Sequence, residues 1–497
     1  MDPDVHPFNL EENGDPAGAD PAYGPQRKLK QRHVQMIAIA GTIGTGLFLG
    51  SGQSISGAGP VGALFAYAFV GSVAFASLCS IGEMTSMAPI TGSFPYYASR
   101  WVDEALGFAN YFFTNAVTIP AEISGAKLLL ALWKVQHLEA YTVLILGVIL
   151  LVNIFGVRYF GETEFGFSLV KLIMIFVLIV IGLVIDLGGA PDHVRRGFEY
   201  WIHPGPLTAN VPSVNRFLGI VSAIMQAAAA YQGIEISTIA AAETENPRRN
   251  VARAMKKAFF RIFVFYIVGV LVAGLIVPST DPNLLQPPGG ITSFNGTAAD
   301  ETVYASPFVI GMMDARFGKP VVSVINAGLL TSAMSAGNSF LFSASRILYG
   351  LALRGQAPGI FGHANCCGVP VPAVLFTPVF YARNQAAFGL LAFITISDAF
   401  QWFYHLAAVG ELITWAIINL TYLRFRIAVV LTQELDVIPP VIFMFFICWR
   451  FLHSPDTSFF WRSGEMDFVL DIPTIEETDP PVPPPRGFWA IFADKIF

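Results

Sequence analysis

The sequence predicts an all-α polytopic membrane protein built as one helical bundle. Of its 497 residues, 54% are hydrophobic and only 13% are charged, whereas soluble domains carry roughly 25% charged residues. Apolar stretches long enough to cross a hydrocarbon core of ~30 Å recur along nearly the whole chain. Short polar turns separate these stretches, which indicates one bundle rather than several soluble domains.

Hydropathy predicts about eleven spans, and a membrane helix needs roughly 20 residues. Six fall in the first half of the chain and five in the second, and the last stretch has the weakest signal. We expect spans near residues 34–53, 61–86, 104–133, 140–157, 164–188, 217–242, 258–278, 320–348, 371–397, 400–424 and 427–452.

The two ends of the chain differ from the bundle in composition. Residues 1–26 are acidic and rich in Pro and Gly, without an apolar run, so we expect residues 1–32 to form a disordered cytosolic tail without a cleavable signal peptide. Residues 454–497 form a second polar tail, rich in proline and acidic residues.

Several functional classes are disfavoured. The net charge of −6 lies largely in the tails, and no basic stripe suits a nucleic-acid partner. The four cysteines make neither a disulfide framework nor a zinc pattern, so we expect no metal and no cofactor.

Neither a His-Glu-x-x-His nor a Gly-x-Ser-x-Gly sequence is present, which argues against an enzyme. The phosphate-binding loop that would couple ATP is also missing from the sequence.

Basic residues predict the orientation, because cytosolic loops carry an excess of Lys and Arg. One basic group precedes the first span and another follows the sixth, so both loops, and the N-terminus, are expected in the cytosol. The loop 279–319 then lies outside and contains the glycosylation sequon at Asn295. The two groups are Arg27, Lys28, Lys30 and Arg32, and Arg248, Arg249, Arg253, Lys256 and Lys257.

The first span contains three glycines and two threonines between Gly41 and Gly46. Each glycine disfavours a helix by ~1 kcal/mol, and unwound backbone is tolerated at membrane depth only where it is buried in protein or lines a cavity. We interpret the cluster as a break in the helix. Close helix packing through small residues is the alternative.

The sixth span has a counterpart at Tyr231-Gln-Gly-Ile-Glu235, which places an amide, a glycine and a carboxylate where apolar residues insert more readily. The two interruptions lie five spans apart, in the first and the sixth span, so each lies in the first helix of a five-helix half. Such a pair is the best sequence pointer to the binding site of a transporter. Freed N–H groups at one break can bind a carboxylate and freed carbonyls an ammonium group, which suits a zwitterion.

These interruptions and four further motifs make the chain resemble the yeast amino-acid transporter family of fungal permeases, within the amino acid-polyamine-organocation superfamily. The resemblance runs from about residue 28 to residue 426. It rests on Gly41–Gly46, Gly82–Met84, Ile119–Glu122, Tyr231–Glu235, Glu243–Arg248 and Ser335–Arg346.

The resemblance implies a five-plus-five inverted-repeat bundle of the leucine-transporter type, with broken first and sixth helices, and twelve helices as the family norm. The transport core would be residues 33–426, with repeat one at about 34–188 and repeat two at about 217–424. Residues 427–453 would form a peripheral helix. The substrate would be held by Gly41, Thr42, Ile43, Gly44, Thr45 and Gly46, and by Tyr231, Gln232, Gly233, Ile234 and Glu235.

Lys171 in the fifth span resembles the lysine that takes the place of a sodium ion in related proton-coupled carriers. A lysine among apolar residues is desolvated and can therefore exchange a proton near neutral pH. A lysine that extends toward the membrane surface is the alternative. Glu122, which follows Pro120 deep in the third span, is the second candidate for proton coupling.

Other charged residues in or beside the spans have expected roles in gating or structure. Glu83 lies near a cytosolic helix end, and Glu243 with Arg248 could close an inner gate or lie in a solvated loop. His405 and Glu411 in the tenth span could belong to a proton route, although an interhelical hydrogen bond is the commoner role of one histidine.

One residue and two segments depart from the family pattern. Ile234 stands where the family usually has Thr, which removes a hydroxyl beside the expected site and favours an apolar or unusual substrate. The ninth span contains Arg383 between polar residues, and the region after residue 426 is short by about one helix of the family's twelve. Either segment could mark faulty splicing.

We therefore expect a plasma-membrane carrier that imports amino acids in symport with protons. Its partners would be the amino acid, protons and the lipid bilayer, with ubiquitin on cytosolic lysines as a further expectation from the resemblance. The alternatives are an amino-acid sensor of the same fold and a non-functional splice variant.

Overall fold

The computed structural model describes residues 29–88, 90, 92–115, 118–133, 137–207, 213–244, 247–284, 306–365, 368–377 and 396–433. Within these ranges all regular secondary structure is helical, apart from one isolated bridge between Leu29 and Thr244. The all-α prediction is therefore confirmed for the described part of the chain. The predicted sequon at Asn295, the segment around Arg383, most of both tails and the side chain of Arg248 lie outside the described residues.

The described residues of the first half form nine helical elements. They are α1 (Gln31–Thr42), η2 (Gly46–Gly50), α2 (Ser51–Met87), α3 (Ser93–Trp101), α4 (Glu104–Asn115), α5 (Thr118–Ala131), α6 (Leu138–Ile154), α7 (Val157–Asp186) and α8 (Glu199–Ile202).

The second half begins with α9 and ends, in the described part, with α15. Its elements are α9 (Ser213–Tyr231), α10 (Ile236–Ile239), η3 (Ala240–Glu243), α11 (Pro247–Ile276), α12 (Pro307–Asp314), α13 (Lys319–Leu353), η4 (Gly359–Gly362) and α15 (Ile396–Gln433).

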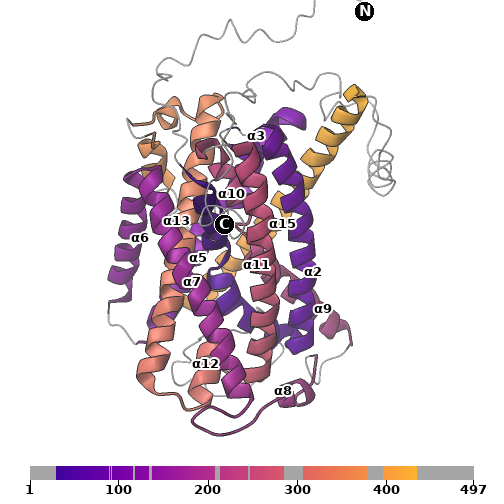
Figure 1. Cartoon of the computed structure of the whole chain (residues 1–497), viewed down its shortest axis with the longest axis vertical. Helices are drawn as coiled ribbons and strands as arrows, with labels where there is room; N and C mark the ends of the chain where they lie inside the picture. The colour runs from indigo at the N-terminus through magenta and orange to yellow at the C-terminus, as the bar shows by residue number, and fades with distance from the viewer. Residues whose placement is uncertain are drawn as a thin grey trace, which may run out of the picture.

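Among the described residues, four helical stretches are long and apolar enough to cross a membrane: Gly46–Met87, Val157–Asp186, Lys319–Leu353 and Phe400–Ala428. Three shorter apolar helices cover residues Ala140–Ile154, Arg216–Tyr231 and Ile262–Ile276. The long helices lie side by side in the order α2, α11, α7 and α13 (Figure 1). The short helices α8 and α12 lie at one end of the bundle and α3 at the other (Figure 1). We name the latter the α3 end.

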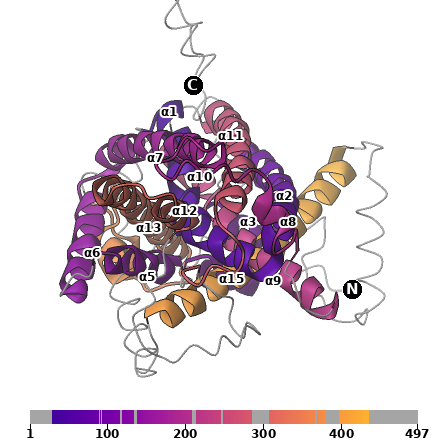
Figure 2. The ribbon, with the colours of Figure 1, turned by 90° about the horizontal axis from the view of Figure 1, so that it is seen from below.

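Large apolar side chains on the outside of the bundle fit a lipid surrounding. Helix α6 lies at the edge of the bundle in both views (Figures 1 and 2) and exposes Val143, Leu144 and Leu151 by 70%, 61% and 57%. Such exposure is unfavourable in water but not against lipid tails. The chain is therefore a multi-pass membrane protein, as its composition predicts.

Several helix boundaries differ from the hydropathy prediction, and two of these differences have a clear cause in the sequence. Helix α7 begins at Val157, seven residues before the predicted start, because the polar run Gly161–Glu164 lowers the hydropathy without breaking the helix. Helix α15 continues to Gln433, past the predicted end at residue 424, because no proline or glycine interrupts residues 425–433.

Helix α2 contains a sharp bend at Gly59, where φ is +78° just before Pro60. A side chain at this glycine would lie 2.8 Å from the backbone of Leu207, so both the positive φ and the close approach favour glycine. The bend separates the segment that follows the first interruption from the long remainder of α2.

Candidate functional site

The helix that begins with α1 stops inside the protein. Helix α1 ends at Thr42, Ile43 adopts an extended conformation (φ −79°, ψ 96°) and η2 begins at Gly46. The freed carbonyl of Ile43 accepts a hydrogen bond from Ser332 Oγ at 2.9 Å, and that of Thr42 accepts one from the Tyr266 hydroxyl at 2.7 Å. All six residues 41–46 are buried, so protein side chains take the place of water at this break.

A second interruption separates α9 from α10. Helix α9 ends at Tyr231, and residues 232–235 form turns before α10 begins at Ile236. Gly233 has a φ of +95°, a backbone conformation that residues other than glycine rarely adopt. The side-chain amide of Gln232 donates to Thr118 Oγ1 at 2.7 Å, and this contact connects the interruption to α5.

The two interruptions touch each other through glycines. A Cβ at Gly233 would lie 2.9 Å from the carbonyl carbon and oxygen of Gly41, and a Cβ at Gly46 would lie 2.5 Å from the Cα of Ala230. The hydroxyl of Tyr266 donates toward the carbonyls of both Thr42 and Ala230, at 2.7 and 2.8 Å. The two sets of predicted substrate residues therefore form one buried site.

Glu122 of α5 reaches the first interruption. Its Oε2 accepts a hydrogen bond from the backbone N–H of Thr45 at 3.2 Å, and a Cβ at Gly44 would lie 2.6 Å from its Oε1. Glu122 is 9% exposed. Its carboxyl group therefore takes up a backbone N–H that the break in the helix leaves free.

Lys171 of α7 is 1% exposed and interacts electrostatically with Glu164 and Glu122. It lies about four turns inside α7, so it does not extend to the membrane surface. One turn earlier, Ser168 Oγ donates to the carbonyl of Met36 at 2.7 Å and joins α7 to α1.

Glu164 is a residue of this cluster that the sequence analysis missed. It is fully buried, and its carboxylate accepts hydrogen bonds from Ser335 Oγ at 2.8 Å and from the side-chain amide of Asn338. It lies two turns before Lys171 on the same helix face. A carboxylate seven residues before a buried lysine was the available signal.

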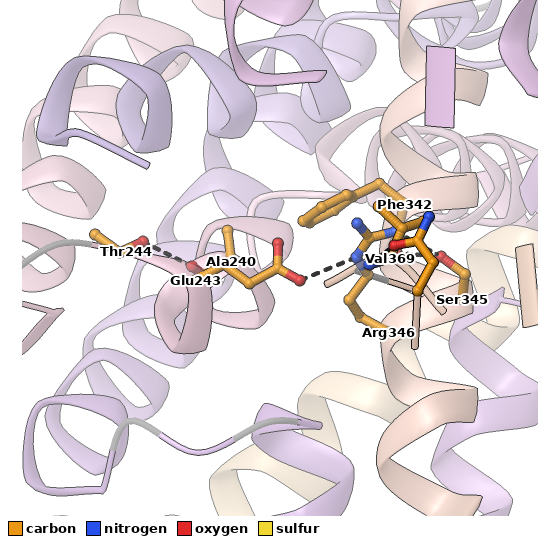
Figure 3. Close-up of polar contacts among 8 residues, drawn as sticks. Ala240, Glu243, Thr244, Phe342, Ser345, Arg346 and Val369 are labelled. Carbon is orange, nitrogen blue, oxygen red and sulfur yellow. Dashed lines mark hydrogen bonds and ion pairs between the residues drawn. The ribbon is translucent and has the colours of Figure 1, made fainter. Parts of the chain in front are cut away.

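Near the α3 end, Glu243 of η3 pairs with Arg346 of α13. Its Oε1 lies 3.2 Å from Arg346 Nε, and both side chains are 3% exposed. The guanidinium also donates to Ser345 Oγ and lies 4.1 Å from the centre of the Phe342 ring (Figure 3). The pair joins the segment after the second interruption to α13. Removing one partner of such a buried charged pair strongly destabilises the folded protein.

The chain before α1 lies against the same region. The backbone N–H of Leu29 donates to the carbonyl of Glu243 at 2.9 Å. His33 Nδ1 lies 3.4 Å from the N–H of Lys30, and its Nε2 lies 3.2 Å from Glu162 Oε1. Residues 29–33 are therefore held by η3 on one side and by α7 on the other.

Glu83 forms a more exposed pair. Arg426 and the hydroxyl of Tyr422, both on α15, donate to Glu83 on α2 at 2.8–2.9 Å. Glu83 is 37% and Arg426 49% exposed, so solvent screens this pair far more than it screens Glu243 and Arg346.

The remaining predicted candidates lie on α15. The imidazole of His405 contacts the side-chain amide of Gln226 at 3.4–3.5 Å. Glu411 is fully buried. The described ranges contain no group of three or more His, Cys, Asp or Glu side chains placed to hold a metal ion.

Comparison with known proteins gives a consistent result. A sequence model of the amino acid permease family matches residues 33–454. The proline-specific permease of Emericella nidulans is 38% identical over 426 residues, which cover 83% of this chain and 74% of that protein. The lysine-specific permease and a general amino-acid permease of Saccharomyces cerevisiae are 37% and 35% identical, each over 80% of this chain. The chain spans 64% of the length of each of these two yeast proteins.

Proposed function

Because the chain belongs to the amino acid permease family, we propose that it imports amino acids across the plasma membrane in symport with protons. It is a transporter rather than an enzyme, since its relatives are permeases. The proton gradient supplies the energy in this proposal.

The proposed architecture is the five-plus-five inverted repeat. The first half runs from α1 to α7 and the second from α9 to α15, and each half begins with an interrupted helix. The α3 end faces the cytosol, because the basic residues near the N-terminus and after η3 lie on that side. Alternating access then consists of movements around the buried interruptions.

The interrupted segments hold the amino-acid backbone of the substrate. A carboxylate binds to the backbone N–H groups around Gly44 and Thr45, where the partial positive charge of a helix N-terminus adds to the attraction. The ammonium group binds carbonyls freed at the second interruption, near Gly233. Zwitterion recognition through the backbone leaves the side chain of the substrate to other residues.

The observation that carries proton coupling is the hydrogen bond from the Thr45 N–H to Glu122 Oε2. An ionised Glu122 occupies this donor and repels a second carboxylate. A proton on Glu122 removes the charge and weakens the acceptor, so the substrate carboxylate can take its place. Proton and substrate therefore favour each other's binding, and by linkage this coupling is reciprocal.

Lys171 and Glu164 support this exchange. Glu164 accepts hydrogen bonds from Ser335 and Asn338, which stabilise its ionised form. Lys171 is then paired with Glu164 and adjusts its interaction with Glu122 according to whether Glu122 carries a proton. The Glu243–Arg346 pair closes the cytosolic side of the site while substrate is bound.

Uptake measurements test the proposal. Permease-deficient yeast that express the chain are given a labelled amino-acid mixture at acidic and at neutral external pH, with and without a protonophore. We expect accumulation that is greater at acidic pH and collapses with the protonophore. Protein at the cell surface without any uptake would contradict transport, and uptake that is insensitive to the protonophore would contradict proton symport.

A further inference from the structure

Two buried carboxyl groups face each other beside the second interruption. Glu235 is 1% exposed and Glu411 is fully buried, and the two carboxyl groups interact directly. Neither oxygen of Glu411 accepts a hydrogen bond from the described residues, and the same holds for Glu235 Oε2. Of the four carboxyl oxygens, only Glu235 Oε1 accepts a hydrogen bond from the described residues, from the N–H of Gly233 at 3.2 Å.

The described part of the chain supplies no positive charge to this pair. The neighbouring polar groups of Glu411 are Glu235 itself, the amide of Gln232 and the indole of Trp415. Two adjacent carboxylates sealed from water cannot both remain ionised without a cation, because the interior neither solvates nor screens them. In the structure described here the pair must therefore hold a proton.

The pair of Glu235 and Glu411 lies where a cation of the substrate could take the place of the proton. Glu235 lies in the interruption that follows α9, within two residues of the Gly233–Gly41 contact. Glu411 projects from α15, which packs against both α9 and α5. The pair therefore lies next to the segment that holds the amino-acid backbone of the substrate, on the side of α15.

We propose that Glu235 and Glu411 form a subsite for a cationic side chain, so that the substrates of this chain are basic amino acids with an ammonium or guanidinium group. This proposal rests on the proposed transport function. A substrate side chain with a positive charge replaces the shared proton and satisfies the unpaired carboxylate oxygens with charge-assisted hydrogen bonds.

The test compares substrates that differ in charge but hardly in shape. Lysine is compared with norleucine and Nε-acetyllysine, and arginine with citrulline, by kcat/KM of uptake in permease-deficient yeast. We expect the wild-type chain to prefer each cationic member by about tenfold or more, the range in which unpaired buried charges discriminate. Uptake of norleucine without preference for lysine would overturn the subsite and leave the transport proposal intact. If no amino acid is taken up, the transport proposal itself fails, and this inference with it.

Two variants assign the preference to the pair. Glu411→Gln removes the charge and is expected to lower kcat/KM for lysine to the value for norleucine, so that the preference disappears. Labelling of the protein at the cell surface reports that the variant has folded. Glu411→Asp keeps the charge but withdraws it by one methylene, so the ratio of lysine to ornithine uptake should rise.

The matched control is Glu199→Gln, which removes one negative charge from the exposed helix α8 and should change neither ratio. If Glu411→Gln does not reach the membrane, the lysine-to-ornithine ratio of Glu411→Asp decides. A preference for lysine that both Glu411 variants leave unchanged would overturn the proposed subsite.

Discussion

The backbone N–H of Thr45 donates a hydrogen bond to Glu122 Oε2 across 77 residues of sequence, at 3.2 Å. This contact joins the interruption after α1 to a carboxyl group in the middle of α5. It gives one acidic side chain direct influence over the backbone that is proposed to bind the substrate carboxylate.

Replacing Glu122 by Gln should uncouple transport from the proton gradient. The amide imitates the protonated carboxyl, so substrate can bind at any pH, but no proton is bound with it. We expect counterflow to persist and concentrative uptake across an imposed pH gradient to fall by about tenfold or more. The measurement is uptake into proteoliposomes, and a Glu122→Gln variant that still concentrates substrate would contradict the coupling role.

Replacing Gly233 by Ala should destabilise the protein. The new Cβ would lie 2.9 Å from the backbone of Gly41, and the φ of +95° is strained for alanine, so we expect a loss of about 1–3 kcal/mol. Thermal unfolding in detergent measures the change. Gly147→Ala in α6 is the control, because a Cβ there meets nothing within 4 Å and alanine favours a helix by ~1 kcal/mol over glycine.

Removing one partner of the Glu243–Arg346 pair should lower the free energy of unfolding more than removing both. Glu243→Gln leaves a buried guanidinium without its carboxylate, and we expect a loss of about 3–5 kcal/mol in the free energy of unfolding. The double variant Glu243→Gln with Arg346→Met removes both charges and should recover much of this loss. Thermal unfolding of the two single variants and the double variant gives the coupling, and strictly additive effects would show that the pair does not interact.

The pair of Glu83 and Arg426 provides the matched comparison. Both side chains are partly exposed, so Glu83→Gln should change the free energy of unfolding by less than about 1 kcal/mol. An equal loss for both pairs would mean that burial does not determine their contributions.

Replacing Lys171 by Met should destabilise the protein more than replacing Lys171 and Glu164 together. The single change leaves two buried carboxyl groups without a cation, with an expected loss of about 3 kcal/mol or more. Glu164→Gln in the same chain removes one of the two charges and keeps a hydrogen-bonding group for Ser335 and Asn338. Thermal unfolding of both variants checks the order, and a double variant less stable than the single one would contradict it.

The sequence predicts the membrane class and most helices because composition and hydropathy are local properties. It also draws attention to residues 41–46 and 231–235, since glycines and polar residues there conflict with a simple apolar helix. The contact between Gly41 and Gly233 is a tertiary relationship, and no local pattern contains it. The placement of Lys171 near Glu122 likewise depends on where the tertiary fold puts α5 and α7.

Two misses have specific physical reasons. Glu164 falls at the predicted start of the fifth span, where a charged residue is ordinary. Because α7 begins seven residues earlier, the same residue is buried in the bundle. The pairing of Glu243 with Arg346 spans 103 residues, whereas the sequence offered Arg248 as the nearest basic residue to Glu243 within its motif.

The anchoring of Leu29 has a mechanical consequence. Leu29, where the described chain begins, donates its backbone N–H to the carbonyl of Glu243, whose side chain pairs with Arg346. A force on the chain that precedes Leu29 would therefore be transmitted to the pair that is proposed to close the α3 end.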